Sequence, residues 1–157
     1  MHHFRRHPYL RRQFLTLGTA ALSLAAVRSV HAGPPQVSVN AKGVAIGGYD
    51  TTAYLRTGVP VEGAVDHVVM WRGVPWQFAS AEDAASFREA PEDFAPQFGG
   101  FCTRAMSFGK VVNGDPTVWR LHQGSLYLFA KPVGAKKFDE GPDAMIIKAR
   151  RAWARLG

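Results

Sequence analysis

Apolar and polar residues alternate over short runs in two separate stretches of the chain, which is the pattern of half-buried β-strands. Residues 67–78 hold two β-prone runs on either side of Arg72-Gly73, and residues 117–129 hold two more around Gln123-Gly124. A two-residue loop that includes glycine suits a tight hairpin turn, because glycine readily takes positive φ. The pattern therefore predicts two β-hairpins.

Helix signals lie before, between and after the two hairpins. Asp50 precedes a short helical run and can cap its first turn, and Ser80 is followed three residues later by Asp83, as in a capping box. Residues 142–156 repeat apolar side chains at spacings of three and four, which predicts an amphipathic C-terminal helix. Several short helices together with two hairpins indicate a small, compact α+β domain.

The same periods predict which side chains form the core. Strand residues two apart share a face, and helix residues three or four apart share a face. The residues expected to be buried on these faces are Trp76, Phe78, Phe87, Trp119, Leu121, Leu126, Leu128, Ile146 and Trp153.

The first 32 residues differ from the rest of the chain and have the features of an export signal. Four arginines precede an apolar run at 14–27, and a small-x-small cleavage pattern follows at 30–32. Arg11 and Arg12, followed by Gln-Phe-Leu, resemble the twin-arginine motif, which implies delivery to the periplasm by the twin-arginine export machinery. The apolar run is shorter than the ~20 residues that span a bilayer, so we expect removal of the signal rather than a permanent membrane anchor.

Much of the positive charge of the chain belongs to this signal. The chain has 19 Lys and Arg against 12 Asp and Glu, but five of the basic residues and none of the acidic ones lie in residues 1–32. The remaining chain is nearly balanced and has no basic stripe with interleaved aromatics, so nucleic-acid binding is not expected. Residues 33–42 contain two prolines and few apolar side chains, and we expect them to be a flexible lead-in to a domain at 43–157.

Cys102 is the single cysteine of the chain and the first candidate for chemistry. It follows Gly99-Gly100 and is expected near the start of a short helix, where a thiolate is favoured. Met106 lies one helical turn further along the same face, so two sulfur atoms share one surface. Free cysteine and methionine also commonly fill a core, so a purely structural role stays open.

A set of motifs follows one another along this chain in a characteristic order. They are Gly47-Gly48-Tyr49-Asp50-x-x-Ala53-Tyr54, Trp76-x-Phe78-Ala79-Ser80-Ala81-Glu82, Pro91-Glu92-x-Phe94-Ala95-Pro96-Gln97-Phe98-Gly99-Gly100-Phe101-Cys102, Gly114-Asp115-Pro116-x-x-Trp119 and Leu126-Tyr127-Leu128. In these motifs the chain resembles the YHS-domain proteins, and more closely the longer, exported branch of that family. The resemblance runs from about Gly43 to Trp153 and implies a compact α+β domain related to small metal-binding modules.

The chain departs from the short members of that family at the positions that would hold a soft metal. Short members carry cysteines there, whereas the corresponding residues here are Ala53, Ala79 and Asp83. Any metal carried by this chain must therefore use other ligands.

The leading hypothesis is a periplasmic binding or accessory protein with a pocket at Cys102 that takes a soft metal such as copper. Thiolate, thioether and imidazole groups suit Cu(I). The candidate metal ligands are Cys102, Met106 and His122, and the other residues expected to line the pocket are Tyr49, Asp50 and His67.

Two other functions stay open from the residues alone. In the first, Cys102 is the nucleophile of an enzyme, His122 is its base, and Asp115 or Asp50 orients the histidine. In the second, the domain binds a protein partner without any chemistry, through an apolar patch built from some of its many aromatic residues.

Overall fold

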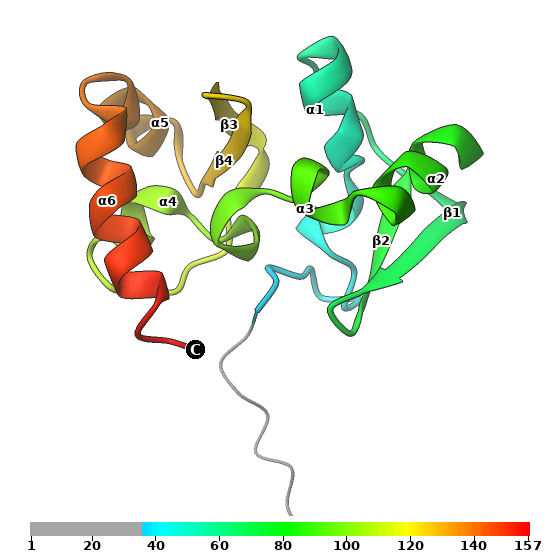
Figure 1. Cartoon of the computed structure of the whole chain (residues 1–157), viewed down its shortest axis with the longest axis horizontal. Helices are drawn as coiled ribbons and strands as arrows, with labels where there is room; N and C mark the ends of the chain where they lie inside the picture. Colours follow the sequence, from blue (N-terminus) through cyan, green and yellow to red (C-terminus); the bar gives the residue numbers. More distant parts are fainter. Residues whose placement is uncertain (1–35) are drawn as a thin grey trace, which may run out of the picture. The chain divides into compact units, whose positions relative to one another are not determined.

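Both predicted hairpins are present, and each forms its own two-stranded antiparallel sheet (Figure 1). In the first, β1 (Ala64–Trp71) pairs with β2 (Val74–Phe78), and in the second, β3 (Asp115–His122) pairs with β4 (Ser125–Phe129). The computed structural model describes residues 36–157, where short helices surround the hairpins, so the predicted α+β fold is confirmed. These helices are η1 (Ile46–Gly48), α1 (Thr51–Thr57), α2 (Ala81–Glu89), α3 (Pro91–Phe94), η2 (Gln97–Gly100), α4 (Thr103–Ser107), α5 (Pro132–Asp139) and α6 (Pro142–Trp153).

The two hairpin turns have the same backbone geometry. Arg72 and Gly73 have φ of 49° and 77°, and Gln123 and Gly124 have φ of 50° and 76°. Two consecutive positive φ values match the right-handed twist of the flanking strands. Both long strands begin earlier than their apolar patterns, at Ala64 and Asp115, and in both the register shifts before regular pairing starts.

Side-chain caps fix the start of α1 and α2, as the sequence predicts. The Asp50 carboxylate accepts a hydrogen bond from the backbone N–H of Thr52, and the Ser80 hydroxyl accepts one from the backbone N–H of Asp83. Helices α3, α5 and α6 instead begin with proline at their first turn, where the missing N–H has no cost.

Strand β4 is the wall between two hydrophobic cores. All four residues from Leu126 to Phe129 are at most 2 % exposed. Leu126 and Leu128 belong to a first core with Trp76, whereas Tyr127 and Phe129 belong to a second core with Met106. Because successive strand residues point to opposite faces, one strand serves both cores.

The first core is built mainly from the N-terminal half of the described chain and the second from the C-terminal half. The first includes Val37, Ile46, Tyr54, Trp76, Phe78, Phe87, Leu126 and Leu128. The second includes Phe98, Phe101, Cys102, Met106, Tyr127, Phe129, Phe138, Ile146 and Ala149.

Three of the nine residues expected to be buried are less covered than predicted. Trp119 and Trp153 are half-buried, and Leu121 is 40 % exposed. Trp119 and Leu121 lie on β3, which has a single neighbouring strand, so no residue of β3 is fully covered. The prediction for Leu121 is therefore wrong, because the face it shares with Trp119 extends past the edge of the core.

The expected flexible lead-in is also wrong for its part within the described residues, 36–42. Val37 and Ser38 are buried. The Ser38 N–H donates to the carbonyl of Gly99, and the Ser38 carbonyl accepts from Ile46 N–H, both at 2.8–2.9 Å. The domain thus includes this segment, held by backbone hydrogen bonds that local composition does not reveal.

Candidate functional site

Cys102 lies in the wall of a cavity of about 300 Å³. The side chain is 5 % exposed and belongs to the second core. The cavity is mostly apolar, and three segments contribute to it: the start and end of α4, the end of β4, and the first turn of α5. The lining residues are Cys102, Arg104, Ala105, Phe108, Ala130, Lys131, Val133 and Gly134.

A run of left-handed backbone brings Cys102 to this place. Phe98, Gly99 and Gly100 have φ of 55°, 61° and 82°. At Gly99 a Cβ atom would lie 2.0 Å from the backbone carbonyl oxygen of Gln36, so only glycine allows the two segments to approach this closely. The chain then turns, and Cys102 N–H donates to the carbonyl of Val112 at 2.8 Å.

Cys102 caps helix α4 through its sulfur atom. The Ala105 N–H donates to Sγ at 3.4 Å, a weak hydrogen bond that orients the side chain. Met106 follows one turn later, with its N–H 2.9 Å from the Cys102 carbonyl, and it is fully buried in the same core. The structure therefore brings Cys102 and Met106 together on one turn, although Met106 does not line the cavity.

The other predicted site residues lie elsewhere. His122, at the end of β3, has Nε2 3.0 Å from Oδ1 of Asp143 and its ring edge-on to Phe138, with ring centroids 5.8 Å apart. His67 is half-buried on β1, and Tyr49 forms an isolated bridge to Glu62. None of these residues lines the Cys102 cavity.

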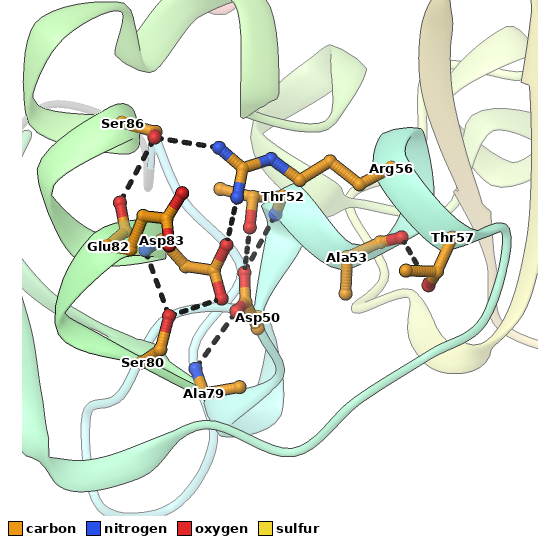
Figure 2. Close-up of polar contacts among 10 residues, drawn as sticks. All are labelled: Asp50, Thr52, Ala53, Arg56, Thr57, Ala79, Ser80, Glu82, Asp83 and Ser86. Atoms are coloured by element: carbon orange, nitrogen blue, oxygen red, sulfur yellow. Dashed lines mark hydrogen bonds and ion pairs between the residues drawn. The ribbon is translucent and has the colours of Figure 1, made fainter.

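Asp50 is fully buried, but in a polar network of the first core rather than beside Cys102 (Figure 2). Its Oδ1 accepts from the N–H and the hydroxyl of Thr52, at 2.8 and 2.7 Å. Its Oδ2 accepts from Ala79 N–H at 2.9 Å, which ties the start of α1 to the end of β2. The donors come from the first turn of α1 and from the residue after β2, so both oxygens of the buried carboxylate have hydrogen-bond partners.

A second carboxylate, Asp83, makes a separate set of polar contacts at the start of α2. It forms an ion pair with Arg56 of α1 and accepts from the Ser80 hydroxyl at 2.7 Å. The Arg56 guanidinium also donates to the Ser86 hydroxyl at 2.7 Å. Figure 2 shows Ala53, Ala79 and Asp83, the three residues that the sequence resemblance aligns with thiols of short YHS domains, near these hydrogen bonds.

Charge is distributed unequally between the two halves of the described chain. Residues 36–102 have four Lys and Arg against eight Asp and Glu, whereas residues 103–157 have ten against four. The cavity lies in the basic half and is lined by Arg104 and Lys131 but by no acidic side chain. Sequence reasoning missed these two cations and Phe108, because only the folded chain brings α4 beside the first turn of α5.

Within residues 36–157, no group of three or more His, Cys, Asp and Glu side chains is placed to hold a metal ion. No helix in this range is both long enough and apolar enough to cross a membrane. Arg11 and Arg12 of the expected export signal lie outside the residues that the structure describes.

Comparison with known proteins adds no further assignment. No family model matches the chain, and neither a curated protein nor a solved structure matches it. The resemblance to YHS-domain proteins therefore rests on the sequence motifs alone.

Proposed function

We propose that this chain is an exported binding protein of the YHS type, with its ligand site in the cavity beside Cys102. The observation that carries the proposal is the cavity itself, about 300 Å³ with a buried thiol in its wall. Small-molecule sites in proteins are concave, mostly apolar, and begin at about this size. Delivery to the periplasm stays a prediction from the twin-arginine pattern at Arg11 and Arg12.

Binding fits these residues better than catalysis. An activated thiol needs a base within hydrogen-bond reach. The partner of the Cys102 sulfur is the N–H of Ala105, which is a donor, and His122 is engaged with Asp143. The cavity can therefore hold a guest, but the predicted Cys–His pair is not assembled beside it.

A copper ion is the second candidate guest, supported by the shared turn of Cys102 and Met106. Their thiol and thioether are soft donors that suit Cu(I). His122, the third predicted ligand, is held at Asp143 instead. When bound, Cu(I) would give the protein a metal-carrying role, with Cys102 and Met106 as its holders.

The proposed function is tested with a neutral apolar probe whose fluorescence rises in apolar surroundings, N-phenylnaphthylamine. We expect saturable binding, and we expect the bound probe to slow alkylation of Cys102 by iodoacetamide. Ala105→Leu places a larger side chain in the cavity and should abolish probe binding. Ala154→Leu, at an exposed position outside the cavity, is the matched control and should bind the probe as the wild type does.

Copper is separated from an apolar guest by a Cu(I) titration against a chelator of known affinity. If Cu(I) is the guest, Cys102→Ser and Met106→Leu should each weaken its binding, and His122→Ala should not. Failure of the wild type to bind the probe or to compete for Cu(I), with unchanged thermal unfolding in all variants, would show that the cavity is not a binding site.

A further inference from the structure

We infer that the guest of the Cys102 cavity is a small amphipathic anion, with an apolar body against the cavity wall and a carboxylate held by Arg104 and Lys131. This inference rests on the proposed function and names its ligand class. It is argued from the apolar lining of the cavity, the two cations in that lining and the N-terminus of α5 beside it.

The walls of the cavity are suited to an apolar body. Phe108 and Val133 are 69 % and 52 % exposed, which is high for large apolar side chains, and both line the cavity. Ala105, Ala130 and Gly134 contribute further apolar surface between them. A guest that covered Phe108 and Val133 would remove apolar area from water, which is favourable by about 25 cal/mol for each Å².

The two charged residues of the lining give the cavity a positive potential. Arg104 comes from α4 and Lys131 immediately precedes α5, so they approach the cavity from different elements. Within residues 36–157 neither forms an ion pair, and the nearest aromatic partner of the Arg104 guanidinium is the Phe108 ring at 6.0 Å. By contrast, four other cations of the same range are paired with carboxylates: Arg56, Arg72, Arg120 and Lys137.

An unpaired arginine and lysine beside apolar surface favour an oxyanion over a neutral or cationic guest. A carboxylate can accept charge-assisted hydrogen bonds from both side chains, and such bonds are roughly twice as strong as neutral ones. A cationic head group would be repelled by the same pair.

The start of α5 adds to this potential. Its first turn has no acidic residue, and its N-cap residue, Lys131, makes no side-chain cap. In α1 and α2 the corresponding positions carry Asp50 and Ser80, whose oxygens already accept from the first-turn N–H groups. The positive end of α5 at the cavity is therefore not neutralised by its own sequence.

The test compares three guests with the same eight-carbon body and different head groups: octanoate, octanol and octylammonium. Each is titrated against bound N-phenylnaphthylamine on the intact chain. We expect octanoate to displace the probe at a concentration about tenfold lower than octanol, a difference of one charge-assisted contact, and octylammonium to be the weakest. Octanoate should also slow alkylation of Cys102.

Charge variants test whether Arg104 and Lys131 cause the preference for octanoate over octanol. The double variant Arg104→Gln, Lys131→Gln should lose about tenfold in octanoate affinity and keep the affinity for octanol. The matched control, Lys136→Gln with Arg151→Gln, removes two exposed cations that do not line the cavity and should bind octanoate as the wild type does.

The outcomes separate the inference from the proposed function. If octanoate and octanol displace the probe equally in the wild type, the cavity binds apolar guests but the anion inference is wrong. Equal losses in the cavity variant and in the control would also overturn it, because the effect would then be one of net charge. If neither the probe nor any of the three guests binds, the proposed function fails, and the inference fails with it.

Discussion

The regions around the two cores differ in their charged groups. Around the first core, carboxylates outnumber cations, and two of them hold the fold together: Asp50 caps α1 and accepts from Ala79 N–H, and Asp83 pairs with Arg56. Around the second core, cations outnumber carboxylates, and two of them lie unpaired at an apolar cavity. A region whose polar groups satisfy one another is stabilised but has little left to bind with, whereas unpaired groups at a cavity are available to a ligand.

This difference bears on which region of the chain can bind a ligand. Of Ala53, Ala79 and Asp83, only Ala53 is buried; Ala79 is exposed, and the Asp83 carboxylate is engaged with Arg56 and the Ser80 hydroxyl. The thiol of Cys102, by contrast, lies in the second core beside the cavity. The second core, rather than the network around Asp50, therefore borders the candidate binding site.

The largest expected effect tests whether the two cores are one cooperative unit. Leu128→Ala truncates a fully buried β4 residue of the first core, and Phe129→Ala truncates its fully buried neighbour in the second. Each should lower the free energy of unfolding by about 3 to 5 kcal/mol, through lost burial and the cavity left behind. Because β4 belongs to both cores, we expect one urea transition in each variant.

The probes for this experiment lie in different cores. Three of the four tryptophans, Trp71, Trp76 and Trp119, pack on the first core and Trp153 packs on the second, whereas helical circular dichroism includes α6 of the second core. Loss of helix signal at a lower urea concentration than the fluorescence change, in Phe129→Ala alone, would show that the second core unfolds by itself.

The next prediction uses two Asp-x-Thr turns, one for each half of the described chain. In both, an aspartate Oδ1 accepts from the N–H and the hydroxyl of a threonine two residues later, Thr52 or Thr117, at 2.7–2.8 Å. Asp50→Ala should cost about 3 kcal/mol, because it removes a helix cap and leaves the Ala79 N–H without its acceptor. Asp115→Ala, the matched control, should cost about 0.5 kcal/mol, since water can replace an exposed acceptor.

Thermal and urea unfolding of the two variants measure this contrast. Similar losses of unfolding free energy in Asp50→Ala and Asp115→Ala would mean that burial does not strengthen the hydrogen bonds of the Asp50 turn. The polar contacts around Asp50 would then not stabilise the first core.

Local signals predicted the first half of the molecule well. The turn dipeptides, the cap at Asp50 and the capping box at Ser80 each act over a few residues, so the sequence shows them directly. The burial of both faces of β4 was missed for Tyr127 and Phe129, although a continuous apolar run of four residues is itself typical of a strand covered on both sides. Helix α5 was also missed, where Pro132 at the first helical turn was an available signal.

The candidate site could be predicted only in part. The sequence pointed to Cys102 and Met106, because their spacing within one helix is a local property. Arg104 and Lys131 are 27 residues apart in the chain and meet only through packing of α4, α5 and β4, which no periodicity encodes. The same limit explains His122, whose pairing with Asp143 of α6 depends on how the C-terminal helix docks.

The last prediction concerns a polar contact between the first core and the second hairpin. The Tyr54 hydroxyl, on α1, donates to the carbonyl of Pro116 at 2.8 Å, and its ring meets Trp119 edge-on with centroids 5.4 Å apart. Tyr54→Phe keeps the ring and removes one hydrogen bond, so it should cost about 1 kcal/mol at neutral pH.

The same variant should change how stability depends on alkaline pH. Burial raises the pKa of Tyr54 well above its usual value, and the nearby Tyr49, Asp115 and Asp50 raise this pKa further. An unfolded tyrosine ionises near pH 10, at about its unperturbed pKa, while folded Tyr54 stays neutral. The contribution of Tyr54 is therefore complete below about pH 10 and is lost as pH rises towards the folded pKa, because ionisation then favours the unfolded chain.

In urea unfolding at a series of pH values, the wild type should lose stability more steeply above pH 10 than Tyr54→Phe does. Parallel slopes would show that the Tyr54 hydroxyl is open to water, and that the first core and the second hairpin separate there.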